Sequence, residues 1–171
     1  MPRPPQRTTA DEMTTLGDSL DRQRAAVVRR LDGLSPEQVR QAPLPSSLTL
    51  AGLVKHLALV EDSWFQDRFL GRGLPEPWAS APFDDDRDWE FNSAVHDEPD
   101  ALLALYAAAC ERSRAAVAEL GDLSARSVQP TLPEREPFSL RWVLIHMIEE
   151  TAQHCGHADL IRESIDGTTY G

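Results

Sequence analysis

Hydrophobic residues recur every three or four positions along four long stretches of the chain, which is the spacing of an amphipathic helix. The pattern predicts helices over residues 11–34, 49–70, 97–120 and 139–166. Glycines stand near the end of each stretch, and Asp97 is the expected N-cap of the third helix. No stretch alternates hydrophobic and polar residues with a clear period of two, so we expect no strand.

Four amphipathic helices joined by loops predict an all-α protein with the architecture of a four-helix bundle. Residues 1–9 are rich in proline and lack periodicity, so they are expected to form a flexible tail before a single domain over residues 10–171. Ser35 begins a predicted short helix. Residues 71–97 are predicted to form a long polar loop, and a loop of this length is usually functional or partly ordered.

Composition and charge narrow the class of protein further. Of 171 residues, 41% are hydrophobic and 26% charged, which is typical of one globular domain. The net charge of -11 repels phosphate and argues against a nucleic-acid partner. No run of about 18 apolar residues predicts a membrane span. With two distant cysteines and no secretory signal, the expected location is the reducing cytoplasm.

Candidate chemistry is concentrated on the last predicted helix. Glu150 and His154 are four residues apart and fall on the line of core positions, where a carboxylate is costly unless a cation compensates it. His56 lies beside the buried face of the second predicted helix. Two histidines and one glutamate with a fourth position open to water form a catalytic type of zinc site, and nickel, iron or manganese would also accept these ligands.

Each of these observations also has a simpler explanation. A lone His56 is more often a core or surface histidine, and Glu150 with His154 can form a solvated pair on one helix. The candidate substrate-binding residues are His157, Trp64 and Arg162. The alternatives are direct metal ligation or support of a ligand for His157, a core role for Trp64 and a surface ion pair for Arg162. No further catalytic side chain is predicted beyond a metal-bound water or thiolate.

Two segments together resemble the DinB/YfiT-like superfamily, and most of all its mini-circle protein branch. They are TLAGLVKHL over residues 49–57 and HMIEETAQHCGHADLIRE over residues 146–163. The resemblance implies a four-helix bundle in up-down-down-up order with one divalent metal held by His56, Glu150 and His154. Many members carry two histidines at the last two positions. The pair of Glu150 and His154 instead resembles the variant found in the N-terminal domain of mycothiol-dependent maleylpyruvate isomerase. This departure leaves the identity and affinity of the metal open.

The resemblance also implies a function. Members use a low-molecular-weight thiol in transfer or isomerisation reactions, so a metal-bound thiolate is expected to attack an electrophilic substrate. Lys55 is the only lysine among 17 basic residues, a bias typical of a GC-rich actinobacterial source, in which the thiol would be mycothiol. Bundles of this size often form homodimers. A non-catalytic metal-binding bundle of stress-response or interaction type and a metal-dependent hydrolase are the alternatives.

Overall fold

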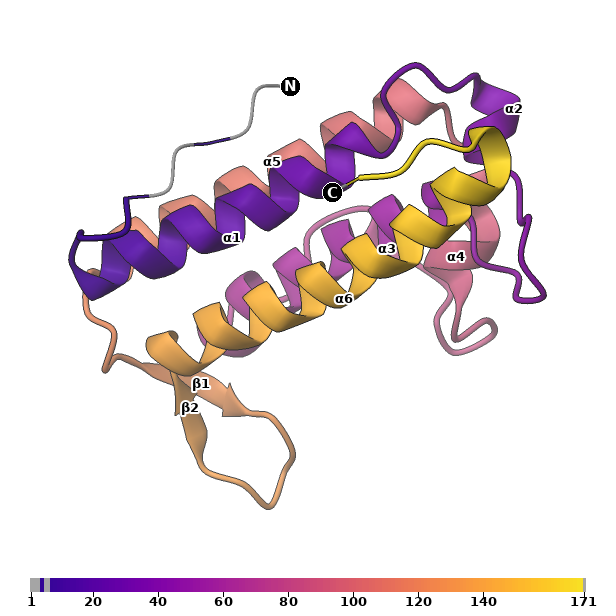
Figure 1. Cartoon of the computed structure of the whole chain (residues 1–171). Coiled ribbons are helices and arrows are strands. Elements are labelled where there is room, and N and C mark those ends of the chain that lie inside the picture. Colours follow the sequence, from indigo (N-terminus) through magenta and orange to yellow (C-terminus); the bar gives the residue numbers. More distant parts are fainter. Residues whose placement is uncertain (1–3, 5–6, 171) are drawn as a thin grey trace.

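A computed structural model describes residue 4 and residues 7–170 of the chain, and it is mostly helical. The predicted all-α class is therefore confirmed. Four long helices lie side by side (Figure 1), with α1 packed against α6 and α3 packed against both α5 and α6. They are α1 (Glu12–Arg29), α3 (Leu50–Asp62), α5 (Pro99–Leu120) and α6 (Leu140–Asp166). The predicted tail over residues 1–9 lies partly outside the described residues.

The helix boundaries follow local capping chemistry. The side chain of Ser139 accepts a hydrogen bond from the backbone N–H of Trp142, which begins α6, and Gly167 ends it with a φ of 76° that favours glycine. Ser35 and Gln38 form a capping box for the short helix α2 (Pro36–Val39). The predicted cap at Asp97 was wrong. Its carboxylate instead accepts a hydrogen bond from a buried lysine, and α5 begins without a side-chain cap.

The helix containing the first half of the resemblance changes its geometry after Asp62. It continues as a π-helix, η1 (Ser63–Phe69), whose wider turn alters which side chains lie on one face. Asp62 is fully buried and forms an ion pair with Arg112 of α5, while neighbouring Glu61 forms one with Arg24 of α1 at 2.6 Å. Because buried charges need partners, these pairs fix α3 between its neighbours.

The segment predicted as a long polar loop is largely ordered. It contains the short helices η2 (Trp78–Ser80), α4 (Trp89–Ser93) and η3 (Ala94–His96). The buried indole of Trp78 donates a hydrogen bond of 2.9 Å to Asp62, so the segment is anchored on α3. Its aromatic residues supply the apolar contacts that a purely polar loop would lack, and they bring α4 over the middle of α3.

A two-stranded hairpin, which the sequence did not predict, joins α5 to α6. The strands β1 (Arg126–Pro130) and β2 (Pro137–Ser139) run antiparallel, and Phe138 is buried beneath them. Strands of five and three residues are too short to show a convincing alternation, so the pattern missed them. Within the described part of the chain, no helix has the length and hydropathy required to cross a membrane.

Candidate metal centre

Three polar side chains from two distant parts of the chain converge between α3 and α6. One ligand atom from each of His56, Glu150 and His154 lies within 4.8 Å of the other two. An oxygen of Glu150 is 3.2 Å from Nε2 of His154 and 3.8 Å from Nε2 of His56. This triad offers two nitrogens and one carboxylate oxygen to a single point, which is a donor set that fits a divalent transition metal.

The helices position the triad for simple geometric reasons. Glu150 and His154 are one turn apart on α6, so their side chains lie on the same face. The backbone of α3 holds His56 opposite them, with its ring edge-on to that of His154 at 5.0 Å between centroids. The three side chains are between 14% and 24% exposed, so molecules from solvent can reach them. The site is thus preformed and accessible.

Glu90 on α4 is a contributor that the sequence analysis missed. Its buried carboxylate accepts a hydrogen bond of 2.9 Å from Nδ1 of His56, and the Phe91 ring stacks on the same imidazole at 4.7 Å. A proton held on Nδ1 leaves the Nε2 lone pair directed toward the triad, as is usual for metal-binding histidines. In the sequence, the sign that Glu90 is buried was its position between two aromatic residues, Trp89 and Phe91.

The metal-free site holds a proton strongly. Burial disfavours the charged imidazolium of His56, but the carboxylates of Glu150 and Glu90 outweigh burial and raise its pKa to about 9. Hydrogen bonds from His154 and His56 hold the pKa of Glu150 well below its usual range. The imidazolium thus places positive charge between two carboxylates, in a position where a divalent cation would balance both.

His157 supports His154 from the side opposite the triad. Its Nδ1 lies 3.4 Å from Nδ1 of His154, whereas Nε2 of His154 is the nitrogen that approaches Glu150. This arrangement fits a positioning role, and His157 is not among the residues whose ligand atoms converge.

The other two candidate substrate-binding residues lie in different surroundings. Trp64 on η1 is half-buried in a group of aromatic rings next to His146. Arg162 is buried near the end of α6, where it forms an ion pair with Asp166 and donates hydrogen bonds to the carbonyls of Arg30 and Asp32. Arg162 therefore ties the ends of α1 and α6 together, which is a structural role.

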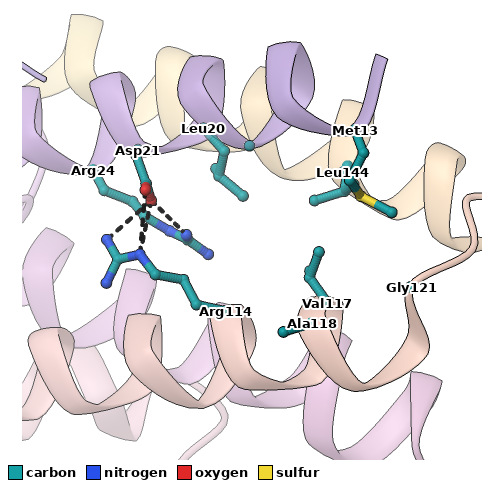
Figure 2. A pocket seen from close by; sticks show the side chains of 10 residues that line it. Met13, Leu20, Asp21, Arg24, Arg114, Val117, Ala118, Gly121 and Leu144 are labelled. Carbon is teal, nitrogen blue, oxygen red and sulfur yellow. Dashed lines mark hydrogen bonds and ion pairs between the residues drawn. The ribbon is translucent and has the colours of Figure 1, made fainter. Parts of the chain in front are cut away.

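A separate pocket of about 260 Å³ lies between α1, α5 and α6 (Figure 2). Its walls are mostly apolar, with Leu20 and Val117 facing each other across it. Its charged residues are paired within the chain, because Asp21 forms ion pairs with both Arg24 and Arg114. No residue of the triad lines this pocket, and it carries none of the predicted chemistry.

The fold and the triad define a mostly helical protein with a two-histidine, one-glutamate site suited to a divalent metal. The family model described as Mycothiol-S-transferase matches residues 15–167, and the chain belongs to this family. This finding confirms the resemblance to the DinB/YfiT-like superfamily.

Comparison with solved structures supports the fold. The chain is similar to a crystal structure of a conserved protein from Enterococcus faecalis, with a TM-score of 0.72 and 17% sequence identity. The match covers 94% of this chain and 100% of the other, and at this identity it bears on the fold alone. No curated protein matches the chain.

Proposed function

We propose that the protein is a divalent-metal-dependent transferase that joins a low-molecular-weight thiol, mycothiol, to a small electrophile. The observation that carries the proposal is the convergence of His56, Glu150 and His154 within 4.8 Å, in a chain of the mycothiol-S-transferase family. Zinc is the proposed metal, because two histidines and one carboxylate are a ligand set typical of catalytic zinc, which would keep one position for an exchangeable ligand.

The residues of the triad have distinct tasks in this proposal. A bound divalent metal would lower the pKa of a coordinating thiol, so that the sulfur is a nucleophilic thiolate near neutral pH. His56 and His154 supply neutral nitrogen donors, and Glu150 supplies negative charge. Glu90 keeps the proton of His56 on Nδ1, which leaves Nε2 free to bind.

The chain does not supply the reactive thiol itself. Cys110 and Cys155 are both buried, and burial raises their pKa values to about 12 and about 11. Thiols with such pKa values are almost entirely protonated at neutral pH and are poor nucleophiles. A thiol from solution is therefore required, and the exposure of the triad allows it to enter.

The order of the helices, the location, the source and the oligomeric state are also part of the proposal. We infer a four-helix bundle in up-down-down-up order, supported by the packing of α1 on α6 and of α3 on α5. A cytoplasmic location, an actinobacterial source and a homodimer stay predictions.

The direct test measures metal content and thiol transfer in the purified protein. We expect about one divalent metal per chain and metal-dependent conjugation of mycothiol with monochlorobimane, in which a C–S bond forms, a C–Cl bond breaks, and a proton and chloride are released. His154→Ala removes one ligand, so it should lose the metal and the catalysed rate together.

Two controls separate this function from its alternatives. His96→Ala removes an exposed histidine outside the triad and should leave metal content and rate unchanged. The double variant Cys110→Ser and Cys155→Ser should stay active if the nucleophile comes from solution. A protein that binds metal but conjugates the thiol no faster than buffer would support a non-catalytic bundle, and ester or amide cleavage would support a hydrolase.

A further inference from the structure

Four aromatic rings gather at the junction of η1, β2 and α6. This aromatic platform consists of Trp64, Phe138, Trp142 and His146. The rings of Trp142 and His146 are stacked at 5.1 Å with an interplanar angle of 8°, and Trp64 meets His146 edge-on at 4.4 Å. Phe138 lies below, 5.2 Å from Trp142 and 5.4 Å from Trp64.

The platform and the triad occupy the same face of α6. His146 precedes Glu150 by four residues, a rise of about 6 Å along the helix axis, and residues at this spacing are neighbours on one helical face. Trp64 follows His56 by eight residues, and its ring meets that of His146 edge-on. The platform therefore begins one helical turn before Glu150 along α6.

The exposed part of the platform is Trp142, since Phe138 is buried and Trp64 and His146 are half-buried. Trp142 is 41% exposed and adjacent Ile145 is 42% exposed, although both are large and apolar. Arg68 places its guanidinium 4.9 Å from the centroid of Trp64 and donates a hydrogen bond to the carbonyl of Thr131 in the hairpin. Trp142 is therefore the accessible ring of the platform, and Arg68 places a positive charge over the neighbouring ring of Trp64.

We propose that this platform binds the electrophilic substrate, and that the substrate is a planar, electron-poor aromatic or conjugated ring. Indole faces carry negative potential and stack favourably on electron-poor rings. Arg68 can bind nitro, carbonyl or carboxylate oxygens on such a ring. The inference rests on the proposed function, because the platform would hold the electrophile beside the thiol. For 1-chloro-2,4-dinitrobenzene, a C–S bond replaces the C–Cl bond, and a proton and chloride leave.

The first experiment measures binding without chemistry. Equilibrium dialysis of the metal-containing protein with unreactive 1,3-dinitrobenzene, in the absence of thiol, should show saturable binding. Trp142→Ala should weaken it about tenfold, the loss expected for one stacking contact of about 1.4 kcal/mol. Leu160→Ala removes another exposed apolar side chain, 56% exposed and about 27 Å farther along the same helix, and should leave binding unchanged.

The second experiment compares two electrophiles with mycothiol as the thiol. Trp142→Ala should raise KM for 1-chloro-2,4-dinitrobenzene about tenfold with kcat changed less than twofold, and should leave KM for aliphatic iodoacetamide unchanged. Equal effects on both electrophiles, or absence of dinitrobenzene binding, would overturn the proposal. So would a dimer that Trp142→Ala converts to monomer without changing dinitrobenzene binding. If the wild type conjugates neither electrophile, the transferase function fails, whereas dialysis still decides whether the platform binds.

Discussion

At the scale of single residues, the contact between Glu90 and His56 orients the imidazole of His56 within the triad. The two side chains come from positions 34 residues apart and meet at 2.9 Å, with Glu90 only 5% exposed. A carboxylate on the far nitrogen of a metal-binding histidine fixes its tautomer and its ring orientation, and makes it a stronger donor. Glu90 also adds a second negative charge near the position of a divalent cation.

Glu90→Ala should weaken zinc affinity about 10- to 100-fold, the usual effect of removing such a partner. Glu90→Gln should weaken it less, because the amide oxygen can still accept the hydrogen bond although the charge is lost. Competition with a chromophoric chelator measures both. The matched control is Glu149→Gln, which removes an exposed carboxylate next to Glu150 and should change affinity little. An equal loss in the control and in Glu90→Gln would mean that general charge, not this contact, governs affinity.

At the scale of elements, α4 packs against α3 and places Glu90 beside His56. Besides the apolar contacts of its aromatic residues, α4 is held by Lys55, which is 4% exposed. Its ammonium donates to Ser93 at 2.8 Å and to Asp97 at 2.6 Å, and lies 4.4 Å from the ring centroid of Trp89. Lys55 and His56 are adjacent on α3. The same turn of α3 therefore binds α4 through Lys55 and accepts the contact of Glu90 through His56.

Lys55→Met keeps the apolar stem but removes the charge that holds α4. We expect a loss of about 1–3 kcal/mol in the free energy of unfolding, together with weaker zinc binding, because Glu90 would no longer be positioned. Urea unfolding and chelator competition measure the two effects. Arg72→Met breaks an exposed pair with Glu119 and should cost less than about 0.5 kcal/mol. If Lys55→Met is destabilised but binds zinc normally, α4 does not act through Lys55.

For the whole molecule, protons and metal compete for His56, and this competition couples stability to pH. In the metal-free protein the pKa of His56 is raised from 6.5 to about 9. Protonation therefore stabilises the fold fully below pH 6.5, and this contribution disappears as pH rises through 9. Metal binding requires the neutral imidazole, so metal affinity should rise over the same range. Glu150 stays ionised throughout, because its pKa is lowered.

Urea unfolding in the presence of a chelator should show stability falling between pH 6.5 and pH 9, by at most about 3 kcal/mol for a shift of this size. With saturating zinc the curve should be nearly flat above pH 6.5, because His56 is neutral both when it binds the metal and in the unfolded chain. His56→Gln removes the titrating group and should flatten the curve of the metal-free protein. A metal-free protein whose stability rises over this interval would contradict the electrostatic description of the triad.

Local rules predicted the helices because each depends on neighbours in sequence. Ser139 and Gly167 mark the ends of α6 through contacts within a few residues, and the apolar periodicity predicted its length. The same rules failed at Asp97, where an expected cap was taken by Lys55 from 42 residues away. They also failed for β1 and β2, which pair over too few residues to show a repeating pattern.

The amino-acid sequence determined the helical class and the three candidate ligands, because polar residues on an otherwise apolar helical face are visible without coordinates. Only the tertiary structure decided that His56 meets Glu150 and His154 within 4.8 Å. It also decided that Glu90 joins them and that Trp64 meets His146 in the aromatic platform. The physical reason is that helix formation follows local hydrogen bonding and side-chain spacing, whereas these contacts depend on how separate helices pack.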